Sequence, residues 1–273
     1  MKQSSLTILG ATGSLGRHVA RQAIAAGLRP CLVVRSPARV PAETAEHSDV
    51  VAADLMTAPL DAVARFAEGR DALVCCAGNV EEGERFVALV DRVASAVELL
   101  PDAARPLCWF MAGAALLDLD ASGRKALDVP QIREVYWPHR ANFERLSRSS
   151  LEWRLLCPGP MVDQPAVGLD RLRISTERLP VVMPPDVDRL TFPELIPHFV
   201  ARLPEMIVPY ADAASLMLAH VSRGGAMSRK RVGLALPIGM LGTKDLRTTR
   251  PIASPEPSRD RSSLIRPTQA AEA

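Results

Sequence analysis

The sequence predicts a doubly wound α/β domain, in which helices cover both faces of a parallel sheet. Short apolar runs typical of strands alternate with helical segments as far as residue 157. Several of these runs are apolar at consecutive positions, as expected for strands that are covered on both faces. A glycine-rich turn joins the first run to the first helical segment.

The composition suits this fold and excludes several classes of protein. A chain of 273 residues with 48% hydrophobic and only 4% aromatic residues can bury a large aliphatic core. The net charge of +2 gives no reason to expect a nucleic-acid partner. The longest apolar run, residues 107–117, is too short to span a bilayer, and the first strand begins too early for a signal peptide. We therefore expect a cytoplasmic protein without a membrane partner, and its oligomeric state stays open.

Cysteine and histidine are spaced unlike metal ligands. The five cysteines lie within apolar, strand-like runs and form no Cys-x-x-Cys pair, and the five histidines are scattered. We predict reduced, buried thiols and no metal site; the cysteines are Cys31, Cys75, Cys76, Cys108 and Cys157.

Residues 10–16 read GATGSLG and place three glycines between the first strand and the first helix. Such a turn lets backbone N–H groups approach a phosphate, which also meets the positive end of the helix dipole. The spacing differs from the G-x-G-x-x-G of the commonest dinucleotide fingerprint, and a purely structural turn is the alternative. We predict that it binds a dinucleotide through Gly10, Thr12, Gly13, Ser14, Leu15 and Gly16.

The expected elements follow in order along the chain. The first helix ends at Gly27, a C-cap position, and a proline opens the helix over residues 59–68. The expected strands are residues 6–9, 31–34, 50–53, 72–76, 107–111 and 153–157. The expected helices are residues 15–26, 59–68, 82–100 and 132–149.

Beyond Gly159 the pattern changes. Prolines are dense over residues 161–209, so this segment is expected to break long elements and to form a substrate-side cover over residues 160–210. A helix over residues 211–220 and a strand over 231–236 then complete a domain that spans residues 1–243. Residues 244–273 are polar and are expected to form a disordered tail.

The carboxyl ends of the strands should hold the ligand. Arg35 ends the second strand, where an arginine matches a 2′-phosphate, so NADP is expected in preference to NAD; an ordinary surface arginine is the alternative. Asp54, directly after the third strand, is expected either to accept from the adenine amino group or to cap a helix. The remaining residues expected at this edge are Ser36, Leu55, Ala77, Gly78, Pro158 and Gly159.

These motifs resemble the atypical branch of the short-chain dehydrogenase/reductase superfamily, in particular its small NAD(P)H-binding, NmrA-like and flavin-reductase-like members. The resemblance covers about residues 4–240. Besides the glycine turn and the strand ends, it rests on FERL at 143–146, SSLEW at 149–153, PG at 158–159 and YADAA at 210–214. It implies a Rossmann-like fold, an NAD(P) cofactor and a small-molecule substrate.

The superfamily's Tyr-x-x-x-Lys pair is incomplete. The matching step runs from Tyr136 to Arg140, whose planar guanidinium keeps the positive charge but cannot release a proton. The usual serine after the fifth strand is missing, and Pro138 is expected to disturb the start of the helix. The resemblance implies Tyr136 and Arg140 as catalytic residues, with His139 as the next candidate donor; a half-buried structural tyrosine is the alternative.

We predict an NADPH-dependent oxidoreductase that reduces a small apolar acceptor, such as a quinone, a flavin or a carbonyl compound. A quinone or flavin needs less from a protein acid than a ketone does, which fits the incomplete tetrad. A non-catalytic NmrA-like sensor of the NAD(P) redox state is the alternative, favoured by the missing serine and lysine. A sugar-nucleotide epimerase or dehydratase is a weaker third hypothesis, because such relatives are longer and keep the lysine.

Overall fold

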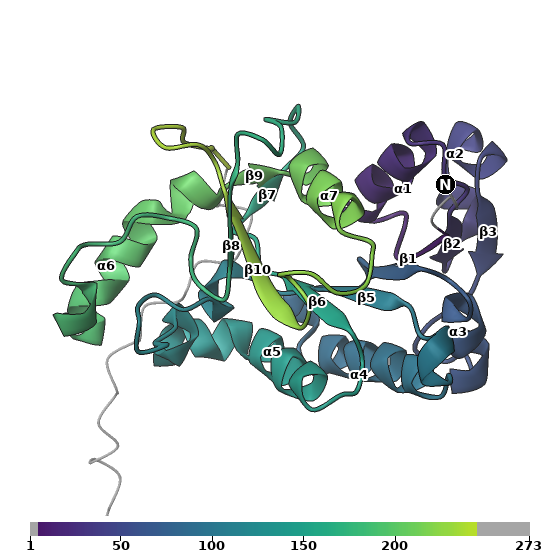
Figure 1. Cartoon of the computed structure of the whole chain (residues 1–273), viewed down its shortest axis with the longest axis horizontal. Helices are drawn as coiled ribbons and strands as arrows, with labels where there is room; N and C mark the ends of the chain where they lie inside the picture. Colours follow the sequence, from purple (N-terminus) through teal and green to yellow (C-terminus); the bar gives the residue numbers. More distant parts are fainter. Residues whose placement is uncertain (1–4, 245–273) are drawn as a thin grey trace, which may run out of the picture.

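The computed structural model describes residues 5–244. Within them, eight strands form one sheet in the order β3-β2-β1-β4-β5-β6-β10-β8 (Figure 1). Neighbouring strands pair in parallel, except that β8 runs antiparallel to β10. The strands are β1 (Leu6–Leu9), β2 (Cys31–Val34), β3 (Asp49–Ala52), β4 (Ala72–Cys75), β5 (Leu107–Met111), β6 (Trp153–Leu156), β8 (Arg173–Thr176) and β10 (Lys230–Ala235).

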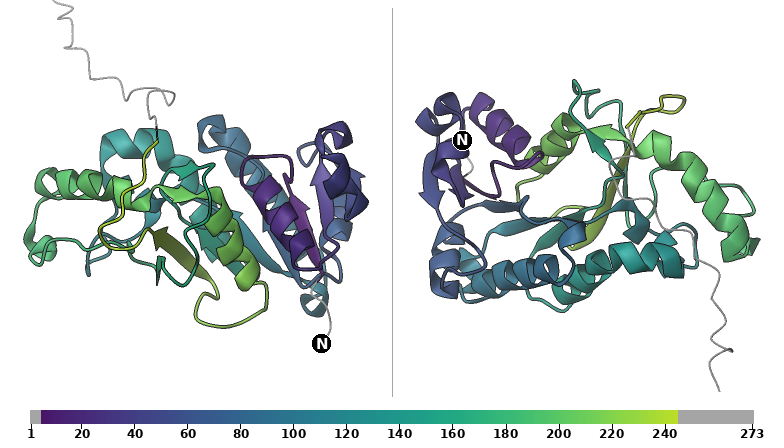
Figure 2. Two further views of the ribbon diagram at one scale, coloured as in Figure 1. Left: turned by 90° about the horizontal axis from the view of Figure 1, so that it is seen from above. Right: turned by 180° about the vertical axis from the view of Figure 1, so that it is seen from behind.

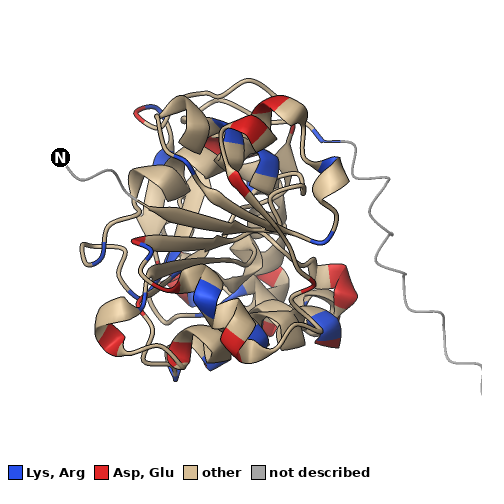
Figure 3. Cartoon of the chain, turned by 90° about the vertical axis from the view of Figure 1, so that its right-hand side faces the viewer, with Lys and Arg blue, Asp and Glu red and all other residues tan. Residues whose placement is uncertain are grey.

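Helices cover both faces of this sheet (Figures 1 and 2). One layer holds α1 (Gly16–Ala25), α2 (Ala42–Glu46) and α7 (Tyr210–Ala219), and the other holds α3 (Leu60–Ala67), α4 (Glu84–Glu98) and α5 (Pro130–Ser147). Figure 3 shows acidic and basic residues mixed over the helices and loops, whereas the strands are mostly uncharged.

Strand side chains alternate between two buried clusters, one under each helical layer. In β4, Ala72 and Val74 pack in the cluster that contains residues of α1 and α7, whereas Leu73 and Cys75 pack in the cluster with α3 and α4. All four are buried, because both sheet faces are covered. The predicted doubly wound α/β fold is therefore confirmed.

The six predicted strands of the first half are confirmed to within one residue. The prediction about Pro138 is wrong. Helix α5 begins at Pro130 and continues through Pro138, so Tyr136 lies in its second turn and not at its start. Pro130 occupies the first turn, where a missing N–H costs nothing, and buried Pro138 packs inside the fold.

Between residues 161 and 209 the elements are short, as the proline density predicts, apart from one helix. This segment adds β8 to the sheet edge and contains the 11-residue helix α6 (Phe192–Arg202). Thr191 and Glu194 form a capping box at the start of α6, in which the backbone N–H of Thr191 donates to Glu194 Oε2 over 2.8 Å. Pro193 stands in the first turn, where proline is tolerated.

Buried carboxylates tie this segment to the rest of the domain. Asp212 on α7 is fully buried and accepts hydrogen bonds from the backbone N–H groups of Val167 and Gly168 over 2.8 and 2.9 Å. Glu205 pairs with Arg173 of β8 over 2.6 Å. A two-stranded sheet of β7 (Met161–Val162) and β9 (Val208–Pro209) closes the same region. The predicted tail, apart from Lys244, lies outside the described residues.

The glycines of the β1–α1 turn differ in how closely the chain surrounds them. A Cβ on Gly16 would lie 2.2 Å from the carbonyl oxygen of Gly10, and Gly10 itself has a φ of +76° and faces the backbone N of Ala77. A Cβ on exposed Gly13 would meet its nearest atom, the same Gly10 oxygen, at 3.3 Å. Gly10 and Gly16 are thus required by the fold itself, and Gly13 much less so.

We expect Gly16→Ala to lower the free energy of unfolding by about 2 kcal/mol or more, because its Cβ overlaps backbone that cannot move aside cheaply. Gly13→Ala should cost less than about 1 kcal/mol. Urea unfolding followed by circular dichroism compares the two variants with the wild type. Equal losses for both variants would contradict this account of the turn.

Candidate functional site

The structure brings the predicted cofactor residues to one edge of the sheet. The backbone N–H of Gly10 donates to the carbonyl of Val33 in β2 over 3.2 Å. On its other side Gly10 contacts the backbone of Ala77, directly after β4. The glycine turn therefore lies between the ends of β2 and β4, at the carboxyl edge where doubly wound sheets hold ligands.

The N-terminus of α1 is open to an anion. Its N-cap residue, Leu15, has no capping side chain, and its first turn contains no acidic residue. Within residues 5–244, the backbone N–H groups of Thr12, Ser14 and Leu15 donate to no protein acceptor. Unpaired N–H groups, the helix dipole and exposed Gly13 together fit the pyrophosphate of a dinucleotide.

Beside this turn, Arg35 is exposed just after β2 and forms no ion pair with any described residue. Ser36 follows it at the start of a short 3-10 turn. Asp54 does not cap a helix: its Oδ1 accepts from the backbone N–H of Met56 over 2.9 Å, and α3 begins later, at Leu60. The carboxylate thus stabilises a turn at the edge of the site.

Leu55, Ala77 and Gly78 complete this side of the edge. Leu55 is buried, and Arg92 of α4 donates to its carbonyl oxygen over 2.9 Å. Gly78 has a φ of +91°, and a Cβ there would lie 2.4 Å from the Phe86 ring. The close packing on Phe86 explains why this position after β4 is glycine.

The Pro158–Gly159 turn follows β6. The carbonyl oxygen of Pro158 accepts from the backbone N–H of Ala114 over 2.8 Å, which joins the loops after β5 and β6. A Cβ on Gly159 would lie 2.5 Å from the carbonyl oxygen of Met206, so this glycine is required where the turn packs on the 3-10 helix η7 (Leu203–Met206). Contact between this turn and a nicotinamide stays a prediction.

A second group of residues gathers where β5 ends. On α5, the rings of Tyr136 and His139 stack with centroids 6.1 Å apart and planes 16° apart. Phe86 from α4 contacts His139 edge-on, with centroids 6.0 Å apart. A Cβ on Gly113, just after β5, would lie 3.0 Å from His139 Nε2. His139 therefore occupies the space beside Gly113 at the end of β5.

His139 is a neutral group at physiological pH. Its side chain is only 6% exposed, and burial lowers the pKa of the imidazole to about 4. Its Nδ1 atom is buried and has no hydrogen-bond partner in the described part of the chain. The ring can accept or donate a hydrogen bond there, but it brings no positive charge to the site.

Arg140 does not bring an unpaired positive charge to the site either. Its Nη2 donates to Asp128 Oδ1 and forms an ion pair with it, which joins α5 to the 3-10 helix η5 (Ala126–Asp128). The hydroxyl of half-buried Tyr136 bonds to no described residue. Catalytic roles for Tyr136 and Arg140 stay predictions, and the structure presents Tyr136 beside a neutral imidazole rather than beside a free cation.

Sequence reasoning missed Asn142, one turn further along α5. Its side chain is buried, and neither its Oδ1 nor its Nδ2 has a partner within the described residues. The three-residue spacing from His139 was the available signal, because residues i and i+3 share a helix face.

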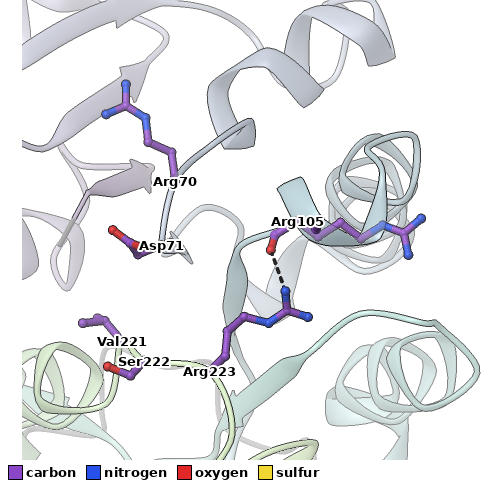
Figure 4. A pocket seen from close by; sticks show the side chains of 7 residues that line it. Arg70, Asp71, Arg105, Val221, Ser222 and Arg223 are labelled. Carbon is purple, nitrogen blue, oxygen red and sulfur yellow. Dashed lines mark hydrogen bonds between the residues drawn. The ribbon is translucent and has the colours of Figure 1, made fainter. Parts of the chain in front are cut away.

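A pocket of about 260 Å³ lies at the opposite edge of the sheet, before β4 and β5 (Figure 4). Two of its arginines bond to the protein backbone: Arg223 Nη1 donates to the carbonyl oxygen of Arg105 over 3.4 Å, and Arg105 Nε donates to the carbonyl oxygen of Leu100 over 2.8 Å. This edge carries neither the glycine turn nor the α5 residues, so it is not the predicted cofactor site.

Other kinds of site find no support in residues 5–244. No group of His, Cys, Asp and Glu there is placed to hold a metal ion, and no helix is long and apolar enough to cross a membrane. The five cysteines form no disulfide, and all are buried except half-buried Cys76. Burial raises the pKa of the Cys75 thiol to about 11, so it is not a reactive thiolate.

The buried imidazole makes stability depend on pH. The unfolded chain takes up the His139 proton first as the pH falls below 6.5, whereas the folded chain does so only near pH 4. The wild type should therefore lose about 2 kcal/mol of stability between about pH 7 and pH 5 that a His139→Gln variant does not lose. Urea unfolding of both proteins measures the difference, and parallel pH profiles would show that His139 is not buried as described.

Comparison with known proteins places this site in a family. The sequence pattern of the NAD(P)H-binding family matches residues 10–180. A sequence search of curated proteins finds no match.

Solved structures with the same fold come from several bacteria. A protein assigned provisionally as an epimerase, from Bacteroides thetaiotaomicron, is 19% identical with a TM-score of 0.65, covering 86% of this chain and 98% of its own. A protein assigned provisionally as an NADH-flavin reductase, from Streptococcus pneumoniae TIGR4, is 16% identical with a TM-score of 0.62, covering 85% and 99%. The anaerobillin reductase ChuY from Escherichia coli O157:H7 is 14% identical with a TM-score of 0.58, covering 86% and 98%.

At these identities the structural similarity shows the fold alone, and the family follows from the sequence pattern, which spans well over half of the chain. It begins at the first glycine of the β1–α1 turn, where the open end of α1 fits a pyrophosphate. The chain belongs to the NAD(P)H-binding family, and its structure has the Rossmann fold.

Proposed function

We propose that this protein is an NADPH-dependent oxidoreductase that reduces a small apolar acceptor, such as a quinone, a flavin or a carbonyl compound. The observation that carries the proposal is the uncapped N-terminus of α1 at the same sheet edge as the Tyr136–His139 pair. A bound nicotinamide supplies the hydride, and the chain has to bind, orient and shield the reactants.

The glycine turn performs the binding. The N–H groups of Thr12, Ser14 and Leu15 would donate to the pyrophosphate, and the dipole of α1 would stabilise its negative charge. Arg35, with its exposed guanidinium just after β2, offers two parallel hydrogen bonds to a 2′-phosphate. These contacts support NADP in preference to NAD.

The α5 residues suit an acceptor that needs little proton transfer from the protein. His139 is neutral, and the charge of Arg140 is balanced by Asp128, so neither side chain places an unpaired positive charge beside the Tyr136 hydroxyl. A ketone reduction would depend on a strong proton donor at this place, whereas a quinone or flavin is reduced readily by hydride alone. The aromatic rings of Tyr136 and Phe86 supply apolar surface beside Gly113.

Two of the three structural relatives described above carry names that support this proposal. Two are called reductases, one for flavin and one for anaerobillin, and a third an epimerase. A sensor would use the same nucleotide site but would not reduce any acceptor. Steady-state assays therefore separate it from the oxidoreductase hypothesis.

Arg35→Ala should weaken NADPH binding by at least about tenfold and leave NADH binding nearly unchanged, since each charge-assisted hydrogen bond is worth about 1.5–3 kcal/mol. Gly13→Val is the matched control: its side chain projects into the exposed turn and should remove binding of both cofactors while the domain stays folded. Isothermal titration calorimetry measures all four affinities. An equal loss for NADPH and NADH in Arg35→Ala would contradict the 2′-phosphate contact.

Oxidation of NADPH with a panel of quinones, flavins, aldehydes and ketones tests the acceptor class. We expect Tyr136→Phe to reduce kcat/KM on the best acceptor by no more than about tenfold, whereas a carbonyl substrate that takes its proton from Tyr136 would lose about 10²–10⁴. A loss above about a hundredfold would overturn the assignment to quinone or flavin. No turnover of any acceptor by the wild type would favour the sensor.

A further inference from the structure

Three buried polar atoms on one face of α5 lack partners within the described residues. They are His139 Nδ1 and both amide atoms of Asn142, Oδ1 and Nδ2. His139 is 6% exposed and Asn142 is 1% exposed. Buried polar atoms are rarely left unpaired because each loses its hydrogen bonds to water, so three on neighbouring side chains call for a ligand that the described residues do not provide.

The spacing of the two side chains fits a single water molecule. Residues i and i+3 of a helix have Cβ atoms about 5–6 Å apart, and His139 and Asn142 form no direct hydrogen bond. A buried water forms about three hydrogen bonds to otherwise unpaired groups. Here it can accept from Asn142 Nδ2 and donate to His139 Nδ1.

That arrangement fixes the state of the imidazole. A nitrogen that accepts a hydrogen bond carries no proton, so a neutral ring with Nδ1 as acceptor has its proton on Nε2. Nε2 is the atom beside Gly113, where a Cβ would lie 3.0 Å away. The N–H of the ring is then directed at the end of β5, beside the stacked ring of Tyr136.

We propose that Asn142 is a positioning residue: through one buried water it keeps the proton of His139 on Nε2, which donates a hydrogen bond to the oxygen of a quinone or carbonyl acceptor beside Gly113. This inference rests on the proposed oxidoreductase function and narrows the acceptor to compounds with a reducible C=O group. The hydride from NADPH joins the acceptor, the electron pair of the C=O bond moves to oxygen, and the oxygen takes its proton from solvent. His139 keeps its own proton and stabilises the charge that develops on oxygen.

Nitrogen NMR of ¹⁵N-histidine-labelled full-length protein tests the water site without any acceptor. The His139 resonances, assigned by their loss in His139→Gln, should show a protonated Nε2 and an unprotonated, hydrogen-bonded Nδ1 near neutral pH. In Asn142→Leu the Nδ1 resonance should move downfield, toward that of a nitrogen without a hydrogen bond. Gln131→Leu, at an exposed position near the start of α5, is the matched control and should leave it unchanged.

The same variants are then assayed with NADPH and a quinone. Asn142→Leu should lower kcat by about tenfold and leave KM for NADPH unchanged, because one oriented hydrogen bond is lost. A proton on Nδ1 in the wild type would overturn the proposal. So would an Nδ1 chemical shift that is the same in Asn142→Leu as in the wild type. If Asn142→Leu does not fold, Asn142→Ser and the wild-type spectrum give the same decision. The expected spectra without turnover of any acceptor would instead refute the oxidoreductase function.

Discussion

The glycine turn of the candidate site is organised around the carbonyl oxygen of Gly10. It accepts from the backbone N–H of Gly13 over 3.0 Å, and a Cβ on Gly16 would lie 2.2 Å away. The chain can fold back this tightly only with glycine at both ends of the turn. Because the turn closes on itself, the N–H groups of Thr12, Ser14 and Leu15 find no acceptor among residues 5–244, and α1 begins without a side-chain cap. The same constraint that shapes the turn therefore leaves these N–H groups available to a phosphate.

The second part of the site differs in its electrostatics. The glycine turn offers positive potential, whereas the α5 residues are arranged so that no free positive charge faces the end of β5. Burial keeps His139 neutral, and Asp128 balances Arg140. A site of this kind favours chemistry in which the cofactor carries the reaction and the protein orients the partners.

Much of the fold could be predicted from the sequence, because periodic burial and glycine placement are local signals. The consecutive apolar residues of β4 show that both sheet faces are covered, and GATGSLG places the turn. The effect of the prolines could not be predicted in this way. Pro193 lies in the first turn of α6 and Pro138 lies inside α5, and neither breaks its helix. The pairing of Arg140 with Asp128 joins residues 12 apart on different elements, which no periodicity reveals. Contact between Gly113 and His139 likewise depends on tertiary packing.

Hydrogen–deuterium exchange with and without NADPH tests most directly the claim that the carboxyl edge holds the dinucleotide. The unpaired N–H groups of the turn should exchange quickly in the free protein and slow markedly when phosphate oxygens accept from them. The account predicts protection over residues 10–16, with weaker protection over 35–36, 53–55 and 77–78. Protection confined to the opposite edge, around Arg70 and Arg223, or no change over residues 10–16 at saturating NADPH, would contradict it.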